Sequence, residues 1–131
     1  MTFEELKRLA NELNPYGKHL GIKITEISDN CVIGLLAVTE NLLNPNGTLH
    51  GGAYYSLADT AAGVLSRTSG RKNVTLEGKL NFIKSVGEGV TIKAIAKKIH
   101  QGKTTGVYLV DIEDENCQIL ATGIYTMYYI E

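Results

Sequence analysis

The segment from Asn41 to Arg67 holds the residues in this chain whose types and spacing best fit catalysis. Its sequence is NLLNPNGTLHGGAYYSLADTAAGVLSR. The triplet His50-Gly51-Gly52 begins a predicted helix, and N–H groups at a helix N-terminus are unpaired and carry partial positive charge. Asp59 follows in the middle of the same helix. Such donors can stabilise an oxyanion, and a carboxylate can act as a base or nucleophile. The segment could therefore catalyse attack on a carbonyl group.

The predicted helix, from about Gly51 to Ser66, has two different faces. Asp59 lies roughly 140° from the centre of an apolar stripe, and its neighbours on that face are mostly small residues that would let a ligand approach. A solvated surface carboxylate would fit the helix alone, but the glycine-rich start and Asn44 upstream favour a functional site. The stripe consists of Tyr54, Leu57, Ala58, Ala61 and Leu65.

The spacing of the two candidate groups predicts how many chains form the site. Gly51 and Asp59 are eight residues apart, which on one helix is about 12 Å of rise and about 80° of rotation. A single carbonyl group cannot contact both. Two copies of the helix, antiparallel about a twofold axis, would bring Gly51 of one near Asp59 of the other. We therefore expect a homodimer with two equivalent sites.

The remaining residues predict an α+β domain that spans 1–131. A capping box at Thr2 and Glu5 begins a short amphipathic N-terminal helix. Short turns between strand-like runs imply one antiparallel sheet, which would curl around the long helix. The last run is apolar on both faces, so we expect another subunit to cover its second face. The runs are Ile22–Ile27, Cys31–Thr39, Val74–Phe82, Val90–Ile99, Thr104–Ile112 and Ile119–Ile130.

Composition excludes several classes of function. A formal net charge of −1 argues against non-specific nucleic-acid binding. The chain has neither a signal peptide nor an apolar run of the ~20 residues that a membrane span needs, which predicts a soluble, cytoplasmic protein. Cys31 and Cys117 are expected to be free and mostly buried. The three histidines have no metal-ligand spacing, so no metal site is predicted.

The central motif resembles the signature of a known family. The run Asn44-x-x-Gly47-x-x-His50-Gly51-Gly52-x-x-x-x-Leu57-Ala58-Asp59 is similar to that of hotdog-fold acyl-CoA thioesterases of the phenylacetate-pathway (PaaI-like) type. The resemblance covers most of the chain. It implies a long central helix wrapped by an antiparallel sheet, in homodimers that pair into a dimer of dimers. It also implies hydrolysis of a coenzyme A thioester to the free acid, with no cofactor beyond the coenzyme A of the substrate.

The resemblance also suggests residue roles. Asp59 matches the essential carboxylate, acting as general base or nucleophile, and the Gly51 N–H matches the donor that polarises the thioester carbonyl. Asn44 would help position the thioester or water, and Thr75 would orient water. The residues expected to bind substrate are His50 and Gly52 at the helix start, Tyr55 at the acyl pocket, and Lys84 and Lys103 near the coenzyme A phosphates.

Two other functions remain open at this point. A non-catalytic acyl-CoA-binding or sensing protein could share the fold, although a pure binder gains nothing from an acid near a thioester oxygen. A hydratase would need a paired Asp and His at the helix start, and Asp59 has no such partner. The acyl group (aryl-acetyl, aromatic or medium-chain) is not identified by the sequence.

Overall fold

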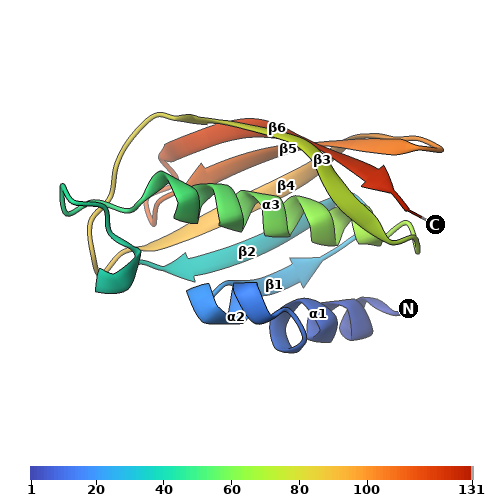
Figure 1. Ribbon diagram of the computed structural model, residues 1–131, viewed down its shortest axis with the longest axis horizontal. Coiled ribbons are helices and arrows are strands. Elements are labelled where there is room, and N and C mark those ends of the chain that lie inside the picture. The colour runs from blue at the N-terminus through green and yellow to red at the C-terminus, as the bar shows by residue number, and fades with distance from the viewer. Residues whose placement is uncertain (131) are drawn as a thin grey trace.

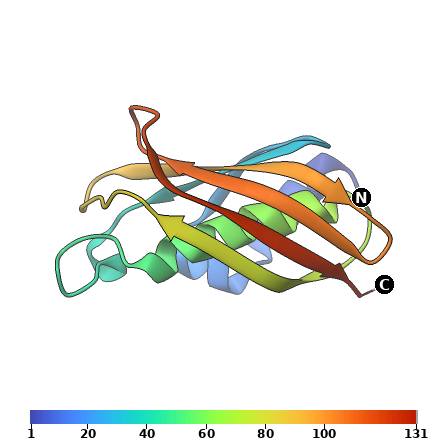
Figure 2. The ribbon, with the colours of Figure 1, turned by 90° about the horizontal axis from the view of Figure 1, so that it is seen from above.

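A six-stranded antiparallel sheet curls around helix α3 (Gly51–Arg67) in the computed structural model, which describes residues 1–130. Figures 1 and 2 show α3 lying along the concave face of the sheet. The strand order is β1-β2-β4-β5-β6-β3, and the predicted helix wrapped by an antiparallel sheet is confirmed. The strands are β1 (Lys23–Ile27), β2 (Cys31–Ala37), β3 (Asn73–Phe82), β4 (Thr91–Gln101), β5 (Thr105–Glu113) and β6 (Ile119–Tyr129).

The apolar stripe of α3 is the part of the helix that the sheet covers. All five stripe residues are at most 3% exposed, as predicted. Two of them are alanines, whose short side chains let the helix and sheet approach closely, and the fully buried Leu57 and Leu65 fill the space beside them. Burial of this stripe fixes the rotation of α3 about its own axis. The face that carries Asp59 must therefore point away from the centre of the sheet.

Two helices, rather than one, precede the sheet. The Oγ1 of Thr2 accepts the Glu5 N–H at 3.0 Å and caps α1 (Phe3–Glu12), as the capping box predicts. Helix α2 (Pro15–Leu20) follows, with Asn14 as its N-cap, and it ends at Gly21 with a φ of 89°. Figure 1 shows both helices beside β1 and α3. Six residues are too few for a helical periodicity to stand out, so α2 was not predicted.

The two edges of the sheet differ in how their main-chain groups are covered. At β1, the Asn11 side chain donates to the Ile24 carbonyl at 2.9 Å and accepts the Ile24 N–H at 2.7 Å. Strand β3, ten residues long, forms the other edge and is largely exposed. An uncovered edge of this length with apolar side chains is suited to pairing with another chain. The exposed apolar residues of β3 and the residue after it are Val74, Leu76, Phe82 and Ile83.

Two burial predictions have different outcomes. The prediction that both cysteines are mostly buried was wrong: Cys31 is half-buried and Cys117 is exposed, in a turn with a φ of 63°. On β6, Ile124 and Tyr128 are 46% and 41% exposed. Cover of that outer face by another subunit stays a prediction. Among residues 1–130, no helix is both long and apolar enough to cross a bilayer.

Candidate functional site

Asp59 and Thr75 form a hydrogen-bonded pair between α3 and β3. The Thr75 hydroxyl donates to Asp59 Oδ1 at 2.6 Å, and the Asp59 side chain is half-buried. Burial raises the pKa of the Asp59 carboxyl above its ordinary value, and the Thr75 hydrogen bond, which favours the ionised form, lowers it by less. The structure thus brings together the two residues that the sequence analysis placed near the reacting water. A carboxylate with a raised pKa is a stronger base than a solvated one.

The pair opens into a cleft of about 480 Å³ between the N-terminal helices, α3 and β3. At one end, Tyr16 of α2 and Ser56 of α3 share a hydrogen bond of 3.0 Å between their hydroxyl oxygens. The sequence analysis missed this wall of the cleft, because helical spacing in α1 shows an apolar face but not what the face contacts. The lining residues from the N-terminal helices are Leu6, Leu9, Ala10, Leu13, Asn14, Pro15 and Tyr16.

The N-terminus of α3 leaves one main-chain donor unused. His50 is the N-cap, and its Nδ1 accepts the Gly52 N–H at 2.8 Å. The Ala53 N–H donates to the His50 carbonyl at 2.9 Å. Within residues 1–130, the Gly51 N–H has no protein acceptor. Of the two glycine N–H groups at the helix start, Gly52 is therefore engaged and Gly51 is free, and because Nδ1 accepts, the neutral His50 ring carries its proton on Nε2.

A second pocket, of about 280 Å³, contains Gly51 but not Asp59. The Phe82 ring lies over Gly51, and a Cβ at residue 51 would be 3.3 Å from Phe82 Cζ. Glycine therefore lets the Phe82 ring pack closely against the first residue of α3. Asn44 and Lys84 line the same pocket, and the Lys84 Nζ donates to Gln118 Oε1. The structure thus places Asn44, Gly51 and Lys84 together at one end of α3.

Asn44 organises the loop between the short helix η1 (Glu40–Leu42) and α3. Its Oδ1 accepts the N–H groups of Asn46 at 2.9 Å and Thr48 at 3.1 Å. Its Nδ2 donates to Thr48 Oγ1 at 2.9 Å, which leaves a second amide hydrogen for another acceptor. A role for Asn44 on substrate stays a prediction.

Two predicted substrate-binding residues lie apart from these pockets in the single chain. Tyr55 packs on Tyr125, with ring centroids 5.2 Å apart, and lines neither pocket. Burial, and then the neighbouring Asp59 carboxylate, raises the pKa of Tyr55. Lys103 is in the β4–β5 turn, where its carbonyl accepts from the guanidinium of Arg71, just beyond the C-terminal end of α3. Lys84 and Lys103 are therefore at opposite ends of α3.

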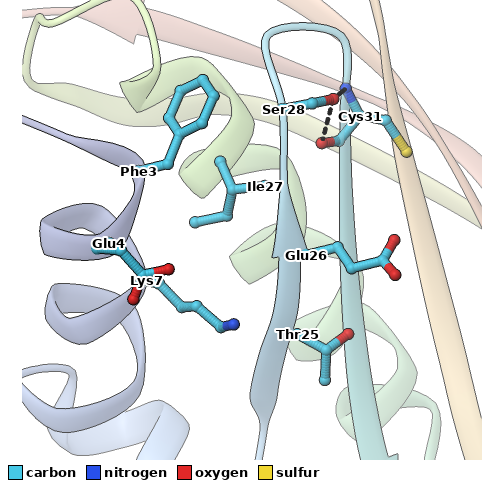
Figure 3. Close-up of a pocket in the computed structure, with 8 residues that line it drawn as sticks. All are labelled: Phe3, Glu4, Lys7, Thr25, Glu26, Ile27, Ser28 and Cys31. Atoms are coloured by element: carbon cyan, nitrogen blue, oxygen red, sulfur yellow. Dashed lines mark hydrogen bonds between the residues drawn. The ribbon is translucent and has the colours of Figure 1, made fainter.

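A further pocket of about 410 Å³ lies between α1 and β1 (Figure 3). Lys7 and Glu26 are among its lining residues. The Ser28 hydroxyl accepts the Cys31 N–H at 3.1 Å and closes the β1–β2 turn at its edge. None of the predicted site residues lines this pocket, so we do not assign the chemistry to it.

Comparison with known proteins identifies the family. A profile of the thioesterase superfamily matches residues 46–121, more than half of the chain, including Gly51, Asp59 and Thr75. The chain belongs to the thioesterase superfamily. The E. coli acyl-coenzyme A thioesterase PaaI is 34% identical over 104 residues, which are 79% of this chain and 74% of that protein. The putative esterase ComA2 of Bacillus subtilis is 37% identical over 121 residues, covering 86% and 91% of the two chains.

Solved structures give the same result for the fold. The structure of E. coli PaaI superposes on this thioesterase with a TM-score of 0.88 at 31% identity, covering 92% of this chain and 87% of that one. This confirms the predicted hotdog fold. A Streptococcus mutans protein bound to acetyl-CoA has a TM-score of 0.79 at 30% identity, covering 82% and 87% of the two chains.

The Thr75 hydrogen bond predicts a measurable effect on Asp59. In Thr75→Val, the ionised carboxylate loses a donor that stabilises it, so the pKa of Asp59 should rise further above its ordinary value. Carbon-detected NMR titration of the side-chain carboxyls measures this directly. Thr122→Val is a matched control, because the Thr122 hydroxyl donates to Asp111 at the same 2.6 Å. An Asp59 pKa that falls or stays constant in Thr75→Val would contradict the assignment.

Proposed function

We propose that this thioesterase hydrolyses acyl-CoA esters to the free acid and coenzyme A, at sites shared by two copies of the chain. Asp59 is the general base on water or the nucleophile, and the Gly51 N–H of the partner polarises the thioester carbonyl. The observation that carries the proposal is the half-buried Asp59 carboxylate, bonded to Thr75 and open to a cleft of about 480 Å³. A relative of this fold binds acetyl-CoA, and another is an acyl-coenzyme A thioesterase, which supports the substrate class.

The chemistry needs few groups because a thioester is already reactive. In the general-base route, Asp59 takes a proton from water, the hydroxide adds to the carbonyl carbon, and negative charge develops on the carbonyl oxygen. One aligned N–H donor stabilises that oxyanion, and its loss typically costs about 10²- to 10³-fold in rate. The tetrahedral intermediate then expels a thiolate, which is a good leaving group because its conjugate thiol has a pKa of roughly 8.5. The Gly51 donor and the Asp59 base are sufficient for these steps.

Two observations support the dimer in this proposal: the open β3 edge of the sheet, and the separation of Gly51 from Asp59. Gly51 and Asp59 line different pockets of one chain and are eight residues apart on one rigid helix. Strand β3 carries Thr75 and forms the open sheet edge, so pairing of two β3 edges about a twofold axis would also set two α3 helices antiparallel. The apolar side chains of β3 would be buried by the same contact.

In this dimer the predicted residues fall into two groups. One subunit contributes Gly51, Asn44 and Lys84, and its partner contributes Asp59 and Thr75. Lys103 lies at the opposite end of α3 from Lys84 in one chain, and antiparallel pairing brings these opposite ends toward each other. Contacts of both lysines with the coenzyme A phosphates are part of the proposal.

Substitution of the carboxylate tests the chemical part of the proposal. Asp59→Asn should lower kcat for a panel of aryl and alkyl CoA esters by about 10²- to 10⁴-fold, the usual contribution of a general base. Thiol release is the readout. Asp111→Asn is the matched control, because Asp111 also accepts a threonine hydroxyl at 2.6 Å but lies on β5. Equal activity of Asp59→Asn and wild type would remove Asp59 from the mechanism, and inactivity of wild type on all esters would favour the binding function.

Misfolding should not explain a loss of activity in the Asp59→Asn variant. The folded-state pKa of Asp59 is raised, so the folded protein holds this proton more tightly than the unfolded chain does. At pH values above that pKa, ionised Asp59 therefore opposes folding, and the neutral amide relieves this opposition. Thermal unfolding of Asp59→Asn at neutral pH should accordingly occur at or above the wild-type temperature.

Complementation between two inactive variants tests the shared site. Gly51→Pro removes the N–H and should keep the helix, since proline is well tolerated at the first helical position and His50 has an extended conformation with a ψ of 138°. Gly51→Ala keeps the N–H and adds the Cβ near Phe82, so it controls for the added volume. Random mixing of Gly51→Pro with Asp59→Asn gives half heterodimers, each with one intact site. This mixture should recover about a quarter of wild-type activity, whereas no recovery would place both groups in one chain.

A further inference from the structure

The cleft at Asp59 continues along α3 as a groove that ends at Arg67. Asp59, Gly63 and Arg67 follow one another at four-residue intervals, and all three line the cleft. A Cβ at Gly63 would have no neighbour within 4 Å, so the surface between the two charged residues is open. The eight residues from Asp59 to Arg67 correspond to about 12 Å along the helix axis. The groove therefore has a carboxylate at one end and a guanidinium at the other.

Between these two ends the groove is lined by apolar and by uncharged polar side chains. Asp59 and Arg67 are the only charged residues that line it in the described part of the chain. Of the uncharged polar side chains, Asn73 donates through Nδ2 to the Gly63 carbonyl at 3.4 Å, and Tyr16 shares a hydrogen bond with Ser56. An alkyl or aryl segment would bury apolar area against the apolar lining residues. The apolar lining residues are Leu6, Leu9, Ala10, Leu13, Pro15, Val64 and Val74.

Arg67 has no anionic partner within residues 1–130. The two ion pairs there are Arg8 with Glu12 and Lys93 with Glu113, and the Arg67 guanidinium donates no hydrogen bond. Arg71, four residues later, differs: it donates to the carbonyls of Lys103 and Gly102 at 2.6 and 2.8 Å and stacks 3.8 Å above the Tyr129 ring. Arg71 thus has a structural role. Arg67 retains unpaired donors that are suited to a carboxylate.

We propose that this groove selects acyl groups that end in a carboxylate, so that the preferred substrates are CoA monothioesters of dicarboxylic acids. This inference rests on the proposed function, since the thioester end of the substrate must lie at Asp59. The acyl chain lies along Gly63, and the far carboxylate pairs with Arg67. A coenzyme A phosphate could also supply an anion to Arg67, and the comparison of esters below distinguishes these two sources.

Matched pairs of substrates test the selection. Adipoyl-, suberoyl- and sebacoyl-CoA differ from hexanoyl-, octanoyl- and decanoyl-CoA only in ending in a carboxylate instead of a methyl group. Wild type should have the higher kcat/KM on the carboxylate-ended member of at least one pair. Arg67→Met keeps the length and apolar stem of the side chain and should reduce kcat/KM on that ester by about 10- to 100-fold, as expected for one charge-assisted hydrogen bond. Methyl-ended esters should change by less than about twofold.

Arg8→Met is the control for loss of a positive charge, because the Arg8 side chain is 75% exposed and lies outside the groove. It should leave both substrate classes unchanged. An equal fall of kcat/KM in Arg67→Met for every ester, acetyl-CoA included, would overturn the proposal and assign Arg67 to the coenzyme A phosphates. Absence of any wild-type preference, or of any effect of Arg67→Met, would also overturn it.

Binding of uncharged-headed analogues separates this inference from the proposed function. Calorimetric titration with suberic acid monoamide and octanamide requires no turnover, because the amide takes the place of the thioester and the far carboxylate is the only charge that differs. Wild type should bind the monoamide of suberic acid more tightly, and Arg67→Met should remove the difference. If the protein hydrolyses no CoA ester but this difference holds, the proposed function fails and the groove assignment stands. If turnover depends on Asp59 but neither binding nor kinetics depends on Arg67, the groove assignment fails alone.

Discussion

The arrangement of this molecule depends on the rigidity of α3, which holds a free N–H and a carboxylate at a fixed separation. Gly51 and Asp59 are eight residues apart, about 12 Å along the axis, and no side-chain rotation can close that distance. Burial of the stripe around Leu57 and Ala61 prevents the helix from turning to present both groups to one cleft. The two pockets of the single chain follow from this, as does the need in our proposal for a second chain. The open β3 edge offers the surface through which that chain would attach.

Two opposing effects of its neighbours determine the pKa of Asp59. The N-terminal helices and β3 enclose the carboxylate and raise its pKa, while the Thr75 hydroxyl limits that rise. The fold therefore accepts a destabilising charge at the point where a base would act, as is common at catalytic sites. The hydrogen bond between Tyr16 and Ser56 fastens α2 to α3 beside the same carboxylate. A short helix that was not predicted from the sequence thus helps to enclose the group on which the chemistry would depend.

The parts of the site that could be predicted from sequence are those determined by local spacing. The α3 stripe, the position of Asp59 away from that stripe and the strands each follow from a periodicity, and the family resemblance suggested that Thr75 acts on the same water as Asp59. The sequence could not show which N–H groups at the start of α3 remain free, because the rotamer of His50 decides whether its ring accepts from the Gly52 N–H. The separation of Lys84 from Lys103 and the packing of Tyr55 on Tyr125 depend on strand register. Arg67 escaped notice because its groove exists only once α1 packs beside α3.

The central claim is that one substrate carbonyl is held by Gly51 of one chain and attacked with the help of Asp59 of another. A crystal structure of the Asp59→Asn variant with an intact acyl-CoA bound tests it most directly. We expect a dimer in which the thioester oxygen lies about 3 Å from the Gly51 nitrogen of one subunit. The side chain of residue 59 from the other subunit should face the carbonyl carbon. A thioester that contacts residues 51 and 59 of the same chain, or one bound far from both, would contradict the account.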